Sequence, residues 1–314
     1  VYSYIIGEYY MAAEFYCPVM TMFLDGKVDY KTQHKLLSRL VDANVDGAVI
    51  LGSASEFYAM TPQMRHEVAI DAISQLQGKM KTYVGTGCLN VADTVSFSNE
   101  MLSAGATGLI IVGPYYIGAD PEGIFEYFDQ VASKTPGDII IYNYPERTSY
   151  DVTPDIINRL LDKHHNIIAI KDTVESATHT QRIINSVKPR HPNFKIFSGF
   201  DNNFLPTVFA GGDGAIGGMC NMAPYMCAAW VKAVNEHDFD TTVFIHHAVC
   251  NLFQVYQQQN PFMPAMKYIL QLQGLGNTDE SMLPATPAIK SVRPKLAELK
   301  ELVDQVQTYI RGEQ

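Results

Sequence analysis

The stretches DIIIYNY at residues 138–144 and IIAIK at residues 167–171 decide the fold. Each is a short, nearly continuous run of isoleucine, and such runs are typical of strands that are buried on both faces. Parallel strands covered by helices have this pattern, whereas strands with one solvated face alternate apolar and polar residues. Both runs end next to reactive side chains, so the carboxyl ends of the strands are the first place to look for chemistry.

Six further apolar runs of similar length recur along the chain, and the segments between them have helical spacing, as at Leu36, Leu37, Leu40 and Val41. Eight alternating strand and helix units predict a closed (β/α)8 barrel of the TIM type. The alternative is a doubly wound open sheet, which normally has a glycine-rich nucleotide loop after its first strand, where this chain reads LDGKVD. The six runs are FYCPVMTMF at 15–23, GAVIL at 47–51, KTYVGTG at 81–87, GLIIVG at 108–113, KIFSG at 195–199 and GAIGG at 214–218.

The domain boundaries follow from this pattern. We expect an N-terminal extension at residues 1–13, a barrel catalytic core at 14–223, and the last barrel helix with a C-terminal helical extension at 224–314. Only helical patterns follow Pro224, and they are too continuous with the barrel to form a separate catalytic domain. They span residues 225–236, 239–258, 261–273 and 293–311.

Composition argues against several classes of function. The 314 residues have a formal net charge of −10, and the isoelectric point is near 5.3. Nucleic-acid surfaces need clustered Lys and Arg, so we expect small metabolites as partners and no nucleic acid. No apolar run approaches the roughly twenty residues of a membrane helix, and the first ten residues do not resemble a signal peptide. The five cysteines form no CxxC pair, which predicts reduced thiols and a cytoplasmic location.

Lys171 closes the apolar run at 167–171. A lysine at the mouth of such a run can lose part of its hydration, which lowers its pKa and leaves a neutral amine able to attack a keto acid. The alternative is a solvated strand end, with Asp172 as a simple ion-pair partner. The neighbours of Lys171 in the fold must decide between these interpretations.

In a (β/α)8 barrel, active sites form at the carboxyl ends of the strands. The expected strand ends here carry many polar and aromatic side chains. Besides Lys171, they are GSASEF at 52–57, GPYY at 113–116, YNYPERT at 142–148, SGFDNN at 198–203 and GAIGG at 214–218.

At these positions the chain resembles the dihydrodipicolinate synthase and N-acetylneuraminate lyase family of class I, pyruvate-dependent aldolases. That family typically has G-[TS]-T-G-E after strand two, PYY or PFY after strand four, YNxP after strand five, and a Lys-Glu or Lys-Asp pair after strand six. Each motif alone is weak. Four in the right order make a specific signal, and the resemblance covers residues from about 14 to 300.

The resemblance implies a set of catalytic residues. Lys171 would form a Schiff base with pyruvate, Tyr142 would move protons, and Ser53 and Tyr116 would complete the proton relay. The tyrosine matching Tyr116 reaches into a neighbouring subunit's site in this family, so the resemblance implies a homo-oligomer, a tetramer built as a dimer of dimers. We expect Tyr115 to serve in packing instead.

The loop after the second strand would hold the pyruvate carboxylate through backbone N–H groups at Ser53 and Ala54. Here the sequence departs from the family, because Ala54 replaces a hydroxyl residue and Ser55 replaces a glycine. If the left-handed conformation of that glycine matters, Ser55 would strain or reshape the turn. We expect Glu56 to tie down this loop, and Gly217 to offer only backbone carbonyls.

The residues that would meet the second substrate point in two directions. Arg147 matches the arginine with which dihydrodipicolinate synthases hold the carboxylate of aspartate semialdehyde, and its guanidinium suits a carboxylate. The alternative is a surface arginine paired with Glu146 or Asp151. Arg147 favours a 4-hydroxy-tetrahydrodipicolinate synthase, which condenses pyruvate with aspartate semialdehyde.

Other residues resemble the aldolases that act on 2-keto-3-deoxygluconate or N-acetylneuraminate. They are Thr173 and the series Gly199, Phe200, Asp201 and Asn202, since in those aldolases an aromatic-Asp-polar series after strand seven hydrogen-bonds substrate hydroxyls. Asp201 has a simpler alternative as the cap of a helix starting near Asn203. The sequence therefore leaves a sugar-acid aldolase open as the second hypothesis.

Two hypotheses of other kinds remain. The altered loop at Ala54 and Ser55 allows a paralogue that binds keto acids without turnover, and a phosphate-handling isomerase is disfavoured because no phosphate cradle follows the last two strands. We expect no cofactor and no metal. The histidine pairs at 164–165 and 246–247 lack ligand spacing with a cysteine or carboxylate partner. Phe57, Tyr58 and Pro62 give no reason to predict inhibition by lysine.

Overall fold

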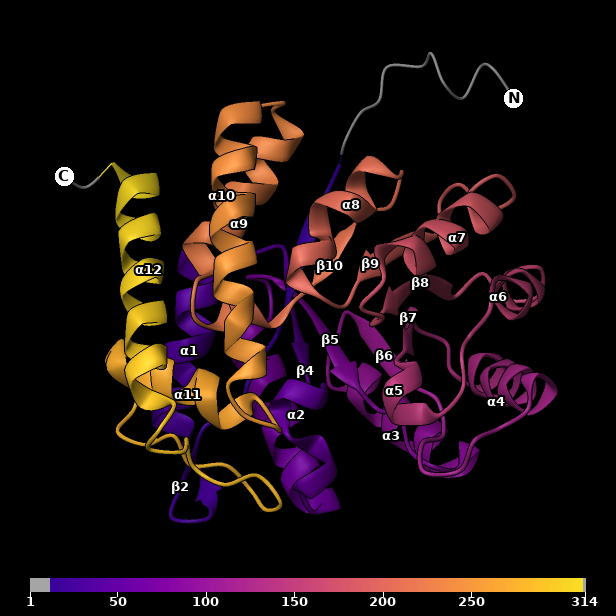
Figure 1. Cartoon of the computed structure of the whole chain (residues 1–314). Helices are drawn as coiled ribbons and strands as arrows, with labels where there is room; N and C mark the ends of the chain where they lie inside the picture. The colour runs from indigo at the N-terminus through magenta and orange to yellow at the C-terminus, as the bar shows by residue number, and fades with distance from the viewer. Residues whose placement is uncertain (1–11, 313–314) are drawn as a thin grey trace.

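The chain forms a closed barrel of eight parallel strands surrounded by helices, in a computed structural model that describes residues 12–312 (Figure 1). The barrel order is β1, β10, β9, β8, β7, β6, β5 and β4, and β4 pairs with β1 to close it. The predicted (β/α)8 fold is confirmed. The strands are β1 (Glu14–Pro18), β4 (Gly47–Ile50), β5 (Lys81–Gly85), β6 (Gly108–Val112), β7 (Ile139–Asn143), β8 (Ile167–Asp172), β9 (Lys195–Ser198) and β10 (Gly214–Ile216).

The first strand is shorter than the apolar run that predicts it. It ends at Pro18, and the end of the run pairs in a separate antiparallel hairpin of β2 (Phe23–Leu24) and β3 (Lys27–Val28). Continuous apolar character reflects burial, and residues 19–23 are buried outside the barrel strands. Hydrophobicity therefore overestimates the strand length here.

Helices connect the strands, and several begin at residues whose side chains cap the first turn. Asp29, Thr61, Asn90 and Asp120 each accept a hydrogen bond from a backbone N–H of the helix that follows. The barrel helices are α1 (Tyr30–Asp42), α2 (Pro62–Leu76), α3 (Val91–Ser103), α4 (Pro121–Lys134), α6 (Pro154–Leu161), α7 (Ala177–Val187) and α8 (Phe204–Phe209). A single-turn helix, α5 (Pro145–Thr148), follows β7.

The C-terminal part is helical and lies against one side of the barrel, at the left of Figure 1. Its elements are α9 (Pro224–Asn235), α10 (Phe239–Leu252), the 3-10 segment η6 (Phe253–Gln257), α11 (Met263–Leu272) and α12 (Arg293–Arg311). These match the four helical patterns of the sequence. Most of the expected N-terminal extension lies outside the described residues.

Side chains alternate between the inside of the barrel and the helical layer, as the period of two in a strand requires. Ile140 and Tyr142 belong to a cluster inside the barrel, whereas Ile139 and Ile141 pack in the outer core. Ala169 belongs to the inner cluster, so Lys171, two residues later, also points inward. Tyr142 and Lys171 are direct register partners on β7 and β8.

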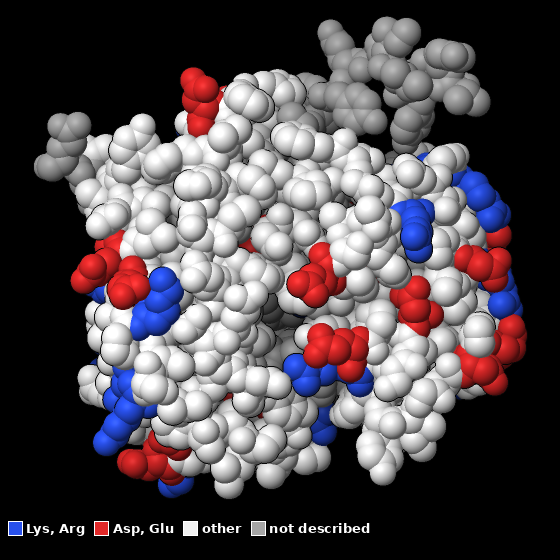
Figure 2. All heavy atoms as spheres, viewed as in Figure 1, with Lys and Arg blue, Asp and Glu red and all other residues white. Residues whose placement is uncertain are grey.

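The apolar length of the helices and the distribution of surface charge concern two kinds of partner, membranes and nucleic acids. None of the described helices is long and apolar enough to cross a membrane. Figure 2 shows Lys and Arg beside Asp and Glu at several places on the drawn face, and a hollow near its centre.

Candidate active site

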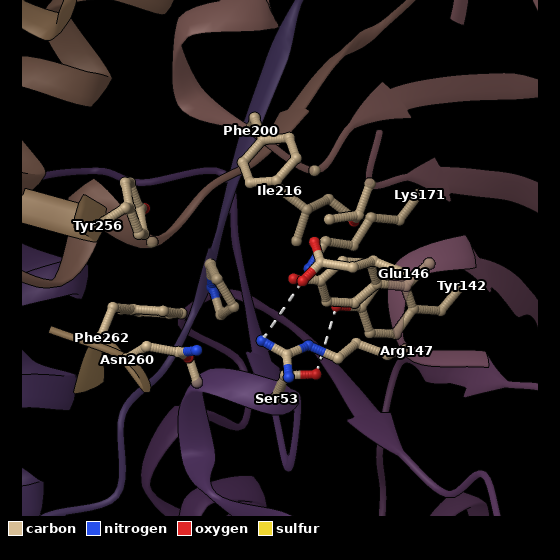
Figure 3. A pocket seen from close by; sticks show the side chains of 16 residues that line it. Ser53, Tyr142, Glu146, Arg147, Lys171, Phe200, Ile216, Tyr256, Asn260 and Phe262 are labelled. Atoms are coloured by element: carbon tan, nitrogen blue, oxygen red, sulfur yellow. Dashed lines mark hydrogen bonds and ion pairs between the residues drawn. The ribbon is translucent and has the colours of Figure 1, made fainter. Parts of the chain in front are cut away.

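Lys171 lies at the carboxyl end of β8 and its side chain is almost completely buried, with 5% of the residue exposed. Its Nζ stands 4.3 Å from the centre of the Tyr142 ring (Figure 3). Burial lowers the pKa of Lys171 to about 8, against an opposing effect of the Asp201 carboxylate. A substantial fraction of this amine is therefore neutral near physiological pH.

Asp172 does not pair with Lys171, so the simple ion-pair interpretation is wrong. Its side chain points away from the barrel interior, as alternation along the strand requires. One carboxylate oxygen accepts from Asn143 Nδ2 at 2.9 Å. The other accepts from Thr180 Oγ1 at 2.7 Å and lies 2.9 Å from His179 Nδ1.

His179 joins the buried Asp172 to Asp151, with Nε2 at 3.0 Å from the Asp151 carboxylate. Hydrogen bonds to Asp151 and Asp172 raise the pKa of His179 to about 10. The imidazolium thus ties the end of β8 to α7 and to the segment after α5. Sequence reasoning missed this cluster, because its members are ordinary polar residues that only the fold brings together.

The His179 cluster predicts a pH-dependent stability. The pKa of His179 is higher in the folded than in the unfolded chain, so its contribution is complete below pH 6.5 and is lost as pH rises toward 10. We expect His179→Gln to lower the free energy of unfolding by about 3 kcal/mol at pH 6, because Asp172 stays buried without its cation. Urea unfolding of the wild type and of His179→Gln between pH 6 and 10 should show that their difference in free energy of unfolding becomes smaller as pH rises.

His66→Gln is the matched control, because His66 Nε2 contacts Glu100 at 2.9 Å on the surface. That change should alter the free energy of unfolding by less than about 0.5 kcal/mol. If the difference in free energy of unfolding between wild type and His179→Gln stays constant over the pH range, the stabilising group is not a charged His179.

The expected proton relay is partly assembled within one chain. Ser53 begins the 3-10 segment η2 (Ser53–Ser55) after β4, and its Oγ is 3.3 Å from the Tyr142 hydroxyl. Burial raises the pKa of Tyr142, while the hydroxyls of Ser53 and Thr173 act in the opposite direction. Tyr142 is therefore a neutral phenol, able to pass a proton between its neighbours.

The strain anticipated at Ser55 does not occur there. The left-handed residues of this loop are Leu51 and Glu56, at φ of 59° and 62°. Ser55 keeps an ordinary backbone and donates its hydroxyl to the Val19 carbonyl at 2.5 Å. The loop therefore accommodates a serine by giving it a buried hydrogen bond.

Glu56 holds this loop in place, as expected. Its Oε1 contacts Lys267 Nζ at 2.5 Å, and neither side chain is exposed. Its Oε2 accepts from the Met282 amide at 2.8 Å. The loop that carries Ser53 and Ala54 is thus anchored to the C-terminal helical part.

A cavity of about 280 Å³ opens at this end of the barrel. Lys171, Tyr142, Ser53 and Ala54 form its inner wall. The other lining residues include Glu146, Arg147, Thr173, Gly199 and Phe200, and the C-terminal part contributes Tyr256, Asn260 and Phe262. Figure 3 shows this last group across the cavity from Lys171 and Arg147.

Tyr256, Asn260 and Phe262 were not foreseen from the sequence. They follow α10, in a stretch whose only sequence signal is helical spacing. Contacts between residues so far apart in the chain leave no local pattern.

Arg147 lies on α5 with 56% of its side chain exposed. Its guanidinium is 5.7 Å from the Tyr144 ring centre and 3.9 Å from Glu146 Oε1. The pairing with Asp151 considered for it does not occur, because Asp151 bonds to His179 and Asn143 instead. The long contact with Glu146 leaves donors of Arg147 available to a ligand.

Asp201 and Asn202 are not on the cavity wall, whereas Thr173 and Gly199 are. The Asp201 carboxylate accepts from the Tyr256 hydroxyl at 2.6 Å and from the Met219 amide at 3.1 Å. Capping is also not its role, because α8 begins after Asn203 without a side-chain cap.

Gly217 does not line the cavity either, although its neighbours Ile216 and Gly218 do. A Cβ at Gly217 would lie 2.2 Å from Asp201 Oδ1. The glycine is therefore needed to make room for the Asp201 carboxylate.

Tyr116 lies in the loop after β6, outside the cavity of its own chain. It is 87% exposed, and its φ of 83° is unusual for a residue with a side chain. Its role in a neighbouring subunit stays a prediction. Tyr115 instead makes an edge-to-face contact with Phe57, at 6.2 Å between ring centres, which fits packing.

Within residues 12–312, no three or more His, Cys, Asp or Glu side chains are grouped so as to hold a metal ion. The five cysteines are free thiols. Besides the amine of Lys171, the cavity wall carries phenols, hydroxyls, the Arg147 guanidinium, the Glu146 carboxylate and the Asn260 amide.

Comparison with known proteins identifies the family of the chain. The sequence model of the dihydrodipicolinate synthetase family matches residues 12–302. The chain is 33% identical to the putative 2-dehydro-3-deoxy-D-gluconate aldolase YagE of Escherichia coli K12, over 92% of this chain and 95% of YagE. It is 30% identical to the 4-hydroxy-tetrahydrodipicolinate synthase of Kosmotoga olearia, over 88% and 92% of the two chains.

Several solved structures superpose closely on this chain. The crystal structure of YagE in complex with pyruvate superposes with a TM-score of 0.89, covering 94% of this chain and 98% of YagE. The synthase from Methylacidiphilum fumariolicum SolV, at 25% identity, gives a TM-score of 0.88 and covers 96% and 98%. The chain therefore belongs to the dihydrodipicolinate synthase family of class I, pyruvate-dependent lyases.

Proposed function

We propose that Lys171 is the Schiff-base residue of this lyase. The observation that carries the proposal is a buried amine of lowered pKa, 4.3 Å from the centre of the Tyr142 ring, whose hydroxyl lies 3.3 Å from Ser53 Oγ. Its Nζ attacks the C2 carbonyl of pyruvate, and loss of water gives a positively charged imine. That charge acidifies the pyruvate methyl group, which passes a proton to the relay of Tyr142 and Ser53 and becomes the carbon nucleophile of an enamine.

Tyr142 carries protons in the later steps. The enamine carbon attacks the aldehyde carbon, and Tyr142 donates its proton to the oxygen that becomes a hydroxyl, regaining one through Ser53. Water then hydrolyses the imine, which frees Lys171 and the product. Cleavage follows the same steps in reverse. A tyrosine at position 116 of a partner subunit would extend this relay.

The pyruvate carboxylate binds at the start of η2 in this proposal. The amides of Ser55 and Glu56 already donate to the carbonyls of Gly52 and Ser53, so they are excluded as ligands. The amides of Ser53 and Ala54 are the candidates, and the small side chain of Ala54 allows close approach. Because Ala54 has no hydroxyl, the site lacks the second hydroxyl that is usual in the family. The backbone amides that would bind the carboxylate are unaffected.

For the second substrate we propose an aldehyde that ends in a carboxylate, with aspartate semialdehyde as the first candidate. Arg147 on the cavity wall carries this choice, since its guanidinium has donors available and matches a carboxylate. The synthase of Kosmotoga olearia is a relative with this name. The reaction is then the condensation of a 4-hydroxy-tetrahydrodipicolinate synthase.

The second candidate is cleavage of a 2-keto-3-deoxy sugar acid. Thr173 and Asn260 line the same cavity as Lys171, and their polar groups suit sugar hydroxyls. YagE and the probable 2-dehydro-3-deoxy-D-pentonate aldolase YjhH of Escherichia coli, at 33% and 31% identity, carry names of this kind. N-acetylneuraminate is a larger variant of the same class.

Trapping with borohydride tests the first half of the proposal. Incubation with pyruvate and borohydride should add one reduced pyruvate to the chain, located on Lys171 by peptide mass. Absence of an adduct would refute the Schiff-base mechanism. An adduct without product from any aldehyde would instead favour a keto-acid-binding protein without turnover.

Arg147→Ala tests the choice of aldehyde. We expect the KM for aspartate semialdehyde to rise roughly 30-fold, because a charge-assisted contact of about 2 kcal/mol is lost. Pyruvate trapping should not change. Steady-state kinetics, beside pyruvate release from 2-keto-3-deoxygluconate and N-acetylneuraminate, supplies the measurement.

Arg159→Ala is the control, because Arg159 also pairs with a glutamate on the surface, at 2.8 Å from Glu122. It should leave the KM unaltered. If Arg147→Ala also leaves it unaltered while sugar acids are cleaved, the second candidate replaces the first.

A further inference from the structure

Glu146 and Arg147 place opposite charges side by side on the cavity wall. Both belong to the single turn α5, and both line the cavity that contains Lys171. Glu146 Oε1 lies 3.9 Å from an Arg147 guanidinium nitrogen, and Figure 3 draws this contact as a dashed line. That separation is longer than a hydrogen bond, so neither group saturates the other. A charged acceptor and a charged donor are therefore both available to a ligand at this point.

Glu146 supplies the negative charge of this wall. Among the described residues that line the cavity, no other side chain carries a carboxylate. The tyrosines on the wall are neutral phenols, because burial raises the pKa of each. The positive groups are Arg147 and the protonated fraction of Lys171. A cationic group of a ligand in this cavity is thus attracted to the carboxylate of Glu146.

Contacts that do not involve the Glu146 carboxylate hold α5 in place. The backbone amides of Arg147 and Thr148 donate to the Tyr144 carbonyl at 2.9 and 3.0 Å. The Thr148 hydroxyl donates to the carbonyls of Tyr144 and Tyr150 at 3.1 and 3.0 Å. The Glu146 side chain itself is 71% exposed. Its charge can therefore be removed without disturbing the turn that carries Arg147.

An aldehyde that is also an α-amino acid matches both charges at once. Aspartate semialdehyde carries an ammonium and a carboxylate on the same carbon, so the two groups can engage neighbouring charges of opposite sign. The carboxylate suits the guanidinium of Arg147, and the ammonium suits the carboxylate of Glu146. A 2-keto-3-deoxy sugar acid offers only hydroxyls here, because its carboxylate belongs to the pyruvate half of the molecule.

We propose that Glu146 is a specificity residue that binds the ammonium group of the second substrate while Arg147 binds its carboxylate. The proposal rests on the condensation proposed above. It narrows the substrate from aldehydes that end in a carboxylate to those that also carry an α-ammonium group. Because the Glu146 side chain is largely exposed, water weakens the attraction, and the expected effect is a preference of several-fold.

The test compares two aldehydes that differ only in the ammonium group. Succinate semialdehyde has the aldehyde and the carboxylate of aspartate semialdehyde but lacks the amine. Full-length wild type, Glu146→Gln and Arg147→Ala are assayed with each aldehyde at saturating pyruvate and neutral pH, and pyruvate consumption gives kcat/KM. Glutamine keeps the size of Glu146 and a hydrogen-bond acceptor, and it removes the charge. Glu122→Gln is the matched control, because Glu122 also contacts an arginine on the surface, at 2.8 Å from Arg159.

In Glu146→Gln, kcat/KM for aspartate semialdehyde should fall about fivefold, and the value for succinate semialdehyde should stay within about twofold. Arg147→Ala should lower both values, because both aldehydes carry the carboxylate. Glu122→Gln should change neither. Trapping of pyruvate by borohydride should be the same in Glu146→Gln as in wild type, since the pyruvate half of the site is intact.

An equal loss for both aldehydes in Glu146→Gln would make Glu146 a support of Arg147, and an unchanged preference would remove it from the site. Either result overturns the proposal. Slower cleavage of 2-keto-3-deoxygluconate, with no change for aspartate semialdehyde, would make Glu146 a ligand of hydroxyls, which also overturns it. A wild type that forms the pyruvate adduct but condenses with neither semialdehyde would refute the proposed condensation itself, and the ammonium site with it.

Discussion

Lys171→Ala should eliminate the pyruvate adduct and lower kcat by roughly four to six orders of magnitude, as removal of a covalent nucleophile does elsewhere. No other lysine stands on the cavity wall among the described residues, so no neighbouring amine can replace it. Intact mass after borohydride treatment measures the adduct, and pyruvate release from a sugar acid or condensation with a semialdehyde measures kcat.

Lys171→Arg separates charge from chemistry. A guanidinium keeps a positive charge at this position but is always protonated, so it cannot attack a carbonyl. We expect this variant to be as inactive as Lys171→Ala, and Lys79→Ala on the surface to retain wild-type activity. An adduct that persists in Lys171→Ala would place the nucleophile elsewhere.

The residues whose orientation follows directly from the sequence lie on the strands. Alternation along a strand is periodic, so the isoleucine runs locate the barrel, and Tyr142 and Lys171, near the carboxyl ends of neighbouring strands, must meet at its mouth. The same logic cannot orient side chains in the loops after the strands. Asp201 stands three residues beyond β9, where nothing in the sequence decides whether it faces the cavity or Tyr256.

The altered loop after β4 shows a second limit to what can be predicted from the sequence. A serine in place of a glycine suggests strain only if that position is left-handed, and here the left-handed residue is the next one, Glu56. Glu56 tolerates the conformation because Lys267 and the Met282 amide hold its carboxylate. Since both partners come from more than 200 residues away, the sequence predicts the anchoring role of Glu56 but not its partners.

Lys267→Met should be among the most destabilising single changes in this protein. It leaves the Glu56 carboxylate in a fully buried position without its cation, and the loss in the free energy of unfolding should be about 3–5 kcal/mol. Because Glu56 anchors the loop of Ser53 and Ala54, the half-saturating pyruvate concentration for trapping should rise as well. Urea unfolding and pyruvate trapping at fixed pH measure the two effects.

The double variant Glu56→Gln with Lys267→Met separates the ion pair from the packing around it. A neutral glutamine can still accept the Met282 hydrogen bond, so most of the lost stability should return, since neither buried charge remains. Lys295→Met, which breaks a surface pair 3.1 Å from Glu298, should cost less than about 1 kcal/mol. A loss in the free energy of unfolding below about 1 kcal/mol for Lys267→Met would mean that water or a neutral carboxyl compensates Glu56. The ion pair would then not be what anchors the loop of Ser53 and Ala54.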